Sequence, residues 1–94
     1  MVQNIDNIKL RIILSLMQNT KHVRALAKDL QESHSTISRK LNELLKEKVL
    51  DYHKEGKNKI FFIKSNIISR DYVLQAEIYK LNLLIDKYPD FMII

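Results

Sequence analysis

The sequence of 94 residues contains no cysteine and no tryptophan, and only one glycine and one proline. Without cysteine the chain has neither disulfides nor thiolate metal sites, and we expect a cytoplasmic protein. Charged residues interrupt every apolar run well before the roughly 20 residues that a membrane-spanning helix needs. The sequence also lacks a glycine-rich phosphate loop, a nucleophile motif and a catalytic pair with recognisable spacing, so we expect no enzymatic activity and no cofactor.

Positive charge is concentrated in the middle of the chain. The net charge is +5 at pH 7, and residues 21–64 hold 11 Lys or Arg against 6 Asp or Glu, whereas the flanking segments together hold five of each. A basic stretch of this kind is typical of binding to a polyanion or an anionic membrane surface, although a solvated cationic face has the same pattern. We favour a polyanion as the partner.

Hydrophobic spacing predicts three helices before residue 50. A first helix within residues 1–19, capped by Asn4 or Asp6, carries more apolar surface than one stripe. A short second helix is predicted over residues 23–30, and Gln31-Glu32-Ser33 is the only connection to the third. In the third helix Ile37, Leu41, Leu44 and Leu45 form one apolar stripe, and Ser33 is its expected N-cap.

The pattern changes after Lys48. Segments 49–54 and 59–64 are rich in β-branched and aromatic residues and flank the only glycine, which predicts an antiparallel hairpin with its tip at residues 54–59. Ser65 or Asn66 then caps a long helix over residues 66–88, which Pro89 ends. The chain is therefore predicted to be one domain, residues 1–94, mainly α with a small β-hairpin (α+β).

A short helix, a three-residue turn, an amphipathic helix and a hairpin are the parts of a winged helix-turn-helix. The stretch ALAKDLQESHSTISRKLNELLKEKVLDYHKEGKNKIFFI, residues 25–63, resembles the winged helix-turn-helix of MarR-like and ArsR-like transcription regulators, especially archaeal ones. The resemblance implies that SHSTISRKL is the recognition helix and KEGKNK the wing. It also implies a sequence-specific regulator that binds double-stranded DNA as a homodimer, with an unknown effector.

Three positions depart from the pattern of that family. Gln31 and Lys48 stand where glycine is usual, and Glu32 stands where a hydrophobic residue is usual. Either Gln31 adopts a left-handed conformation at some energetic cost, or the turn has a slightly different shape. The turn is also expected to be packed more loosely.

The candidate DNA-binding residues lie in the third helix and at the hairpin tip. In the helix, Arg39 suits guanine O6 and N7, whereas serine and threonine hydroxyls suit phosphates and base edges. At the tip, long cations reach a phosphate backbone or a minor groove. Lys21 and Arg24 are weaker phosphate candidates. The full set is His34, Ser35, Thr36, Ser38, Arg39, Lys40, Asn42, Lys54, Lys57, Asn58 and Lys59.

Other polar residues carry weaker signals. His22, His34 and His53 form no pair at helical spacing and have no carboxylate cluster beside them, so no metal site is expected, although ArsR-like sensors often carry one. Glu43 and Glu47 alternate with lysines and are interpreted as ordinary surface charges.

The last helix has two apolar seams. Leu74, Ile78, Leu81, Ile85 and Tyr88 follow steps of 4, 3, 4 and 3 residues. Periodicity does not say which seam packs on the core and which binds a partner. The second seam consists of Tyr72, Ala76, Tyr79 and Leu83. We predict a homodimer interface that contains this second seam and part of the first helix. Its residues are Leu10, Leu14, Tyr72, Ala76, Tyr79 and Leu83.

The chain ends in an apolar run, residues 89–94, that is typical of a strand just beginning. This run either packs against the dimer or indicates that the chain is the N-terminal module of a longer protein, for example one with a nucleotidyltransferase-like domain. A third interpretation of the basic face is that it docks an acidic protein partner.

Overall fold

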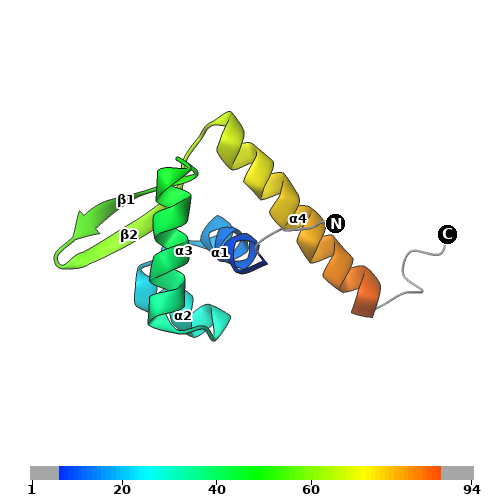
Figure 1. The fold of residues 1–94 in the computed structure, drawn as a ribbon, viewed down its shortest axis with the longest axis horizontal. Helices are drawn as coiled ribbons and strands as arrows, with labels where there is room; N and C mark the ends of the chain where they lie inside the picture. The colour runs from blue at the N-terminus through cyan, green and yellow to red at the C-terminus, as the bar shows by residue number, and fades with distance from the viewer. Residues whose placement is uncertain (1–6, 88–94) are drawn as a thin grey trace.

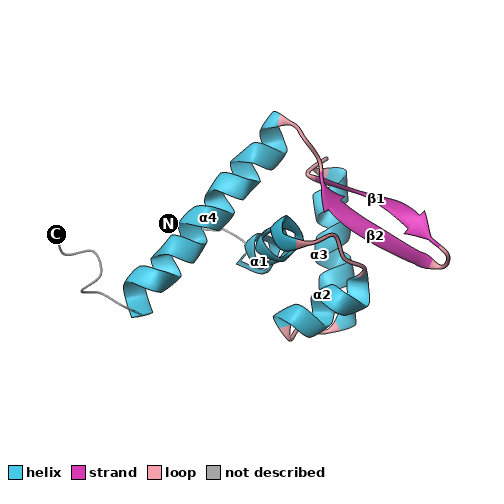
Figure 2. Cartoon of the chain, turned by 180° about the vertical axis from the view of Figure 1, so that it is seen from behind, coloured by secondary structure: helices cyan, strands magenta, loops and turns pink. Residues whose placement is uncertain are grey.

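The computed structural model describes residues 7–87, which form five segments in the predicted order (Figure 1). Three helices are followed by an antiparallel hairpin and a long helix, as Figure 2 shows from behind. The elements are α1 Asn7–Gln18, α2 Val23–Leu30, α3 His34–Lys46, β1 Leu50–Glu55, β2 Asn58–Ile63 and α4 Ile67–Lys87. The predicted caps Asn4 and Asp6, and the apolar run 89–94, lie outside the described residues.

Helix α1 lies at the centre of the molecule and is in contact with α2, α3, α4 and β2. Ile12 and Ile13 point to different sides of α1, and both are fully buried. Most of the surplus apolar surface predicted for this helix is therefore covered within the chain itself, although Met17 is exposed and Leu14 is half-buried. The rest of the core comes from the predicted stripes of α2 and α3, with Val49, Leu50 and Phe61 from the hairpin.

The end of α2 determines how α3 leaves the turn. The N–H of Gln31 donates to the carbonyl of Lys28 (3.3 Å), and the N–H of Glu32 donates to that of Ala27 (3.0 Å). Gln31 has φ 54° and ψ 44°, the left-handed conformation that usually selects glycine in this Schellman arrangement. Of the two expected alternatives, the structure shows the left-handed glutamine.

The end of α3 repeats this arrangement. Lys48 has φ 64°, its N–H donates to the carbonyl of Leu45, and the N–H of Val49 donates to that of Leu44, both at 3.0 Å. Val49 and Leu44 are fully buried, which supplies the apolar contact that accompanies this motif. The ends of α2 and α3 are thus each set by a non-glycine residue in the left-handed conformation.

Glu32 does not leave the turn loose, contrary to expectation. The guanidinium of Arg11 in α1 lies 3.2 Å from the Glu32 carboxylate and also donates to the carbonyl of Leu30 at 2.6 Å. A charged anchor to α1 therefore stands in place of the hydrophobic contact that is usual in the family.

The two strands pair one residue closer to the turn than predicted. Glu55 is opposite Asn58, so only Gly56 and Lys57 form the turn. Gly56 has φ 62° at the first turn position, as in a type II′ hairpin, and glycine tolerates this conformation without strain. Phe61 of β2 also exchanges backbone hydrogen bonds with Lys21 (2.8 and 3.4 Å), which fastens the hairpin to the connection between α1 and α2.

Helix α4 begins where predicted. The side-chain oxygen of Asn66 accepts a hydrogen bond from the backbone N–H of Ser69 at 2.8 Å, so Asn66, and not Ser65, is the N-cap. The Asn66 amide also donates to the carbonyl of Lys48, and the Ser69 hydroxyl donates to that of Val49. These bonds attach the start of α4 to the end of α3.

Replacing Lys48 by glycine tests the left-handed end of α3. We expect Lys48→Gly to stabilise the protein by about 0.5–1 kcal/mol, because roughly 1–2 kcal/mol of strain is relieved while the unfolded chain gains entropy. Thermal unfolding measures the change. Lys80→Gly, at an exposed position inside α4, is the control and should cost about 1 kcal/mol. If Lys48→Gly and Lys80→Gly destabilise the protein equally, the backbone of Lys48 is not strained.

Candidate nucleic-acid interface

The polar face of α3 presents the first half of the predicted set. Ser33 caps the helix by accepting a hydrogen bond from the N–H of Thr36 at 3.1 Å, as predicted. His34, Ser35, Arg39 and Asn42 are exposed, whereas the stripe of Ile37, Leu41 and Leu44 is buried. The helix therefore offers its polar side chains to a partner while its apolar side holds the core.

Three members of the helix set are less accessible. Thr36 and Ser38 are half-buried, and the Thr36 hydroxyl accepts a hydrogen bond from the Ser33 hydroxyl at 2.8 Å. The Lys40 side chain is only 15% exposed, and its ammonium lies 4.0 Å from the Glu43 carboxylate. Of the two cations of α3 in the predicted set, Arg39 is thus the more accessible to a ligand.

The hairpin presents the second half of the set. Lys54, Lys57, Asn58 and Lys59 are all exposed, at or beside the two-residue turn. Lys54 lies directly opposite Lys59 in the ladder, so two like charges face one another across the strands. The Lys59 ammonium lies 4.7 Å from the centroid of the Tyr52 ring, a cation–π contact.

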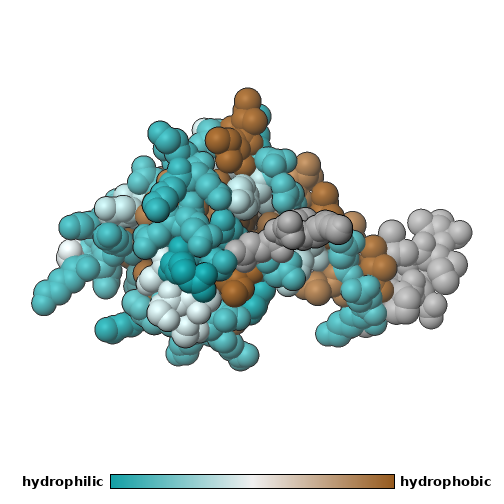
Figure 3. Space-filling view, in the orientation of Figure 1, coloured by the Kyte–Doolittle hydropathy of each residue, from teal (hydrophilic) through white to brown (hydrophobic). Residues whose placement is uncertain are grey.

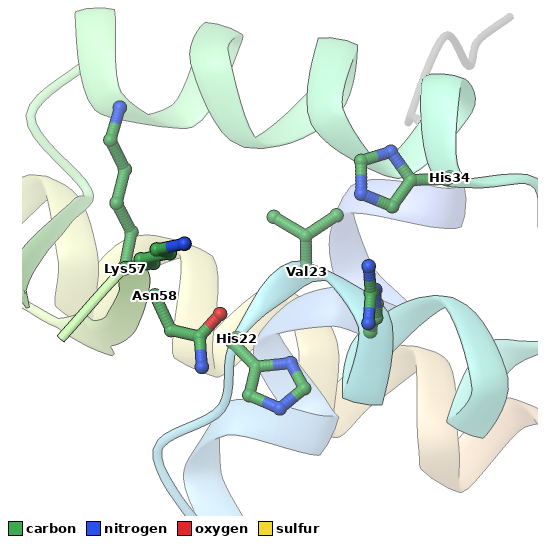
Figure 4. A pocket seen from close by; sticks show the side chains of 7 residues that line it. His22, Val23, His34, Lys57 and Asn58 are labelled. Atoms are coloured by element: carbon green, nitrogen blue, oxygen red, sulfur yellow. The ribbon is translucent and has the colours of Figure 1, made fainter. Parts of the chain in front are cut away.

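A hollow of about 610 Å³ separates the hairpin from the starts of α2 and α3 (Figure 4). Figure 4 shows Lys57 and Asn58 on one side, His34 on the other and Val23 between them. The fold therefore brings Arg24 and His34 to the predicted wing residues. The lining residues are His22, Val23, Arg24, His34, Lys57, Asn58 and Lys59.

His22 has no predicted role in a site, although it lines this hollow. Its Nδ1 accepts a hydrogen bond from the backbone N–H of Ala25 at 3.2 Å, so His22 is the N-cap of α2. Histidine is not among the usual capping residues, so its position before the helix did not predict this cap. His53 lies elsewhere, with its Nε2 3.1 Å from the Glu55 carboxylate.

Lys21 has a structural position instead of the predicted phosphate contact. Its side chain is 15% exposed, and its ammonium donates to the Asp29 carboxylate (2.6 Å) and to the hydroxyl of the buried Ser15. Hydrogen bonds from Lys21 and Ser15, with the charge of Lys21, lower the pKa of Asp29 below its ordinary value of 3.8. The network ties α1, α2 and the Lys21–Phe61 bridge together.

Asp29→Asn tests this network through pH. Because the pKa of Asp29 is lowered in the folded state, its carboxylate stabilises the fold above about pH 4, and this contribution disappears as pH falls through the lowered value. The parent protein should therefore exceed Asp29→Asn in urea stability at pH 7, and the two should converge below pH 4. Asp86→Asn, at the exposed end of α4, is the control. A difference in urea stability between the parent and Asp29→Asn that does not change with pH would contradict this role of the Asp29 carboxylate.

A second charged cluster sets the position of α3. The ammonium of the buried Lys9 lies 3.1 Å from Glu43 and 3.0 Å from Glu47, and the Tyr72 hydroxyl donates to Glu47 at 2.5 Å. Burial alone lowers the pKa of Lys9, but the hydrogen bonds that its ammonium donates to Glu47 and Glu43 outweigh this effect, so the pKa is raised. The interpretation of both glutamates as ordinary surface charges is therefore wrong, since they join α3 to α1.

The structure reverses the expected allocation of the two seams of α4. Ala76 is fully buried, and Tyr72 and Tyr79 pack against the core, as does Leu10 of α1, which is 2% exposed. Burial within the chain leaves Leu10 and Ala76 no surface for a partner, whereas Tyr72 and Tyr79 are only half-buried. The other seam is exposed instead, with Leu74 at 55%, Ile78 at 49% and Leu81 at 44%.

The exposed seam continues into a groove beside α1. Leu14 is half-buried and, with Met17, Leu81 and Leu84, lines a hollow of about 260 Å³. Leu83, 50% exposed, borders a neighbouring hollow with Leu14. Figure 3 shows apolar residues gathered along α4, whereas the side of α3 and the hairpin is mostly hydrophilic. Leu83 is thus exposed, and Leu14, Tyr72 and Tyr79 are half-buried, among the predicted interface residues.

The described residues contain neither a metal-binding cluster nor a membrane-spanning helix. Within residues 7–87, no three His, Cys, Asp or Glu side chains gather as a metal site would require. None of the helices described here combines the length and apolar character needed to cross a membrane. The basic face of α3 and the hairpin is therefore the principal candidate site.

No protein-family model matches this sequence, and no curated protein matches it. Solved structures do resemble it. The adhesin competence repressor AdcR of Streptococcus pyogenes has a TM-score of 0.78 at 16% identity, covering 97% of this chain and 68% of that one. The transcriptional regulator BldR of Sulfolobus solfataricus has a TM-score of 0.77 at 17% identity, covering 99% and 68%.

A third similar structure is a homodimeric winged helix-turn-helix DNA-binding domain from Mycobacterium bovis, described as a possible ArsR-family transcriptional regulator. Its TM-score is 0.68 at 19% identity, and the match covers 95% of this chain and 77% of that one. These three structures are described as a repressor, a transcriptional regulator and a possible transcriptional regulator. The likeness and the element order together establish that the chain has a winged helix-turn-helix fold.

Proposed function

We propose that this protein is a regulator of transcription that binds specific sequences in double-stranded DNA as a homodimer, without enzymatic activity. The observation that carries the proposal is one continuous surface, made of the exposed polar face of α3, the cationic hairpin tip and the hollow between them. A helix of this kind enters the major groove with its first turns, and a hairpin beside it reaches the backbone.

Arg39 and Lys57 have different roles in this proposal. Arg39 lies in the second turn of the exposed face of α3, where a guanidinium reaches guanine O6 and N7. Lys57 lies in the two-residue turn of the hairpin, where an ammonium meets phosphates. The first contact depends on the base and the second does not, so the two side chains are separable by experiment.

Binding to duplex DNA should weaken steeply with salt, because each neutralised phosphate releases counterions and contributes about −0.9 to the log–log slope. Arg39→Ala should lose roughly 1–3 kcal/mol at a selected site and blur one base preference. Lys57→Ala should weaken all sequences alike. Fluorescence anisotropy with selected and random duplexes measures both effects, and Arg70→Ala, on α4, is the matched control.

Two outcomes would overturn the assignment. A flat salt response would exclude the polyanion site. Identical behaviour of Arg39→Ala and Lys57→Ala on selected and random duplexes would exclude the separate roles of helix and hairpin.

The partner in the homodimer is proposed to cover the exposed seam of α4. Leu74, Ile78 and Leu81 are spaced by four and three residues, as in helices that pack along one another. A two-fold arrangement of this kind presents two recognition helices about 34 Å apart, one turn of DNA, and favours a near-palindromic site. The groove containing Leu14 extends the same apolar surface.

Ile78→Glu tests the seam. A charge at this exposed position should leave the chain folded but monomeric, with much weaker binding to a palindromic duplex, because a buried unpaired charge is unfavourable at an interface. Ala76→Glu, on the buried side of the same helix, should instead unfold the chain. Sedimentation and circular dichroism separate these results. An Ile78→Glu protein with the same oligomeric state as the parent would refute this interface.

A further inference from the structure

The hollow that Leu83 borders lies between α1, α2 and α4, and it shares no lining residue with the hollow beside the hairpin. Its volume is about 280 Å³, just below the roughly 300–1,000 Å³ that is typical of ligand pockets. Arg11, Leu14 and Gln18 of α1 are spaced by three and four residues, so one face of that helix lines the hollow. A space of this size admits one small metabolite.

One part of the wall is apolar. Each of the three helices contributes a leucine, namely Leu14 from α1, Leu30 from α2 and Leu83 from α4. Leu30 is buried and Leu14 is half-buried, whereas Leu83 is 50% exposed. An apolar group of a ligand placed here would remove the exposed part of Leu14 and Leu83 from water, which is favourable.

The polar part of the wall carries one charge of each sign beside the end of α2. The Arg11 guanidinium donates to the carbonyl of Leu30 at 2.6 Å, and the carboxylate of Asp29, one residue earlier, accepts from the Ser15 hydroxyl at 2.9 Å. Ser15 follows Arg11 by one helical turn, so the guanidinium and the carboxylate lie close together. A ligand with a cation and an anion on the same carbon atom suits this pair.

Both charges already have one partner, which leaves the hollow close to neutral overall. Glu32 accepts one N–H of Arg11 at 3.2 Å, and Lys21 donates to the Oδ2 atom of Asp29 at 2.6 Å. The guanidinium retains further N–H donors, and Oδ1 of Asp29 accepts no hydrogen bond from the described residues. A ligand that carries both charges is therefore favoured over a simple anion or cation, which would bring an unbalanced charge into the hollow.

Two uncharged groups of the wall have unused hydrogen-bonding capacity. The Tyr79 hydroxyl and the Gln18 side-chain amide form no hydrogen bond with any other of residues 7–87, although Tyr79 is half-buried against the core. Both groups can donate to a carboxylate oxygen. The hollow thus combines apolar walls with a few convergent polar groups, as small-molecule sites do.

We propose that this hollow binds a free α-amino acid with an apolar side chain, of which leucine is the probe. Its ammonium would meet Asp29, its carboxylate Arg11, and its side chain the leucines of the wall. Because the same guanidinium anchors the turn between α2 and α3 through Glu32, the ligand carboxylate competes with that anchor. The binding site itself does not depend on the proposed DNA binding.

Calorimetric titration of the whole chain tests the two charges separately. Leucine should bind, whereas 4-methylpentanoate, which lacks the ammonium, and 3-methylbutylamine, which lacks the carboxylate, should each bind at least about tenfold more weakly, because a charged hydrogen bond is lost. Asp29→Asn should weaken leucine binding and leave that of 4-methylpentanoate unchanged. Glutamate and lysine, whose side chains are charged, should not bind.

A second pair of variants tests the location. Leu83→Trp fills the hollow and should abolish leucine binding. Asn82→Trp places the same ring at an exposed position of α4 that does not line the hollow, and it should bind leucine as the parent does. Circular dichroism checks that both variants are folded. Equal leucine affinity of the two variants would overturn this location.

Glu32 provides an independent readout, because it competes with the ligand for Arg11. Glu32→Gln should strengthen leucine binding about two- to fivefold, the size expected for an exposed ion pair. Glu55→Gln removes a carboxylate from the hairpin and should change nothing. A purely structural role of Glu32 would instead leave leucine binding unchanged or weaken it, and that result would contradict the contact with Arg11.

The remaining outcomes separate this site from the DNA-binding function. Tight binding of 4-methylpentanoate that is insensitive to Asp29→Asn would overturn the amino acid as the ligand. A chain that binds duplex DNA but no apolar amino acid at millimolar concentration would overturn the hollow alone. Leucine binding by a chain that binds no duplex would support the hollow and refute only the proposed DNA binding.

Discussion

The burial of the apolar residues of α1 against its neighbours is the constraint on which the rest of the structure depends. This helix contacts α2, α3, α4 and β2, and its Ile12 and Ile13 are fully enclosed. Each of the surrounding elements is amphipathic and is oriented by the side that it must turn toward α1. The polar face of α3 and the exposed hairpin tip are therefore on the outside because their opposite faces cover the same central helix.

Charged contacts then refine what apolar burial leaves open. Lys9 joins α1 to α3 through Glu43 and Glu47, Arg11 holds the turn through Glu32, and Lys21 fixes the connection before α2 through Asp29. Burial of leucine and isoleucine is not directional, whereas a hydrogen-bonded ion pair is. These pairs specify how the helices that carry the candidate site sit on α1.

Most of the fold was predictable from local patterns in the sequence. The helical spacing of Ile37, Leu41 and Leu44, the cap at Ser33 and the glycine between two β-rich segments each indicate one element without knowledge of the others. The roles of Lys21 and Lys9 were not predictable, because a lysine in the sequence does not reveal a partner 8 or 38 residues away. The allocation of the two seams of α4 was not predictable either, because both seams fit a helix and periodicity does not show which one holds the fully buried Ala76.

The two left-handed residues that follow α2 and α3 have a consequence for motion as well as for stability. Glycine in such positions provides a backbone joint with many accessible conformations, whereas a residue with a side chain has few. Gln31 and Lys48 therefore restrict the pivoting of α3 against α2 and the hairpin. A recognition helix held in this way would meet DNA as a rigid template, and adjustment to the duplex would fall to the hairpin and to the DNA itself.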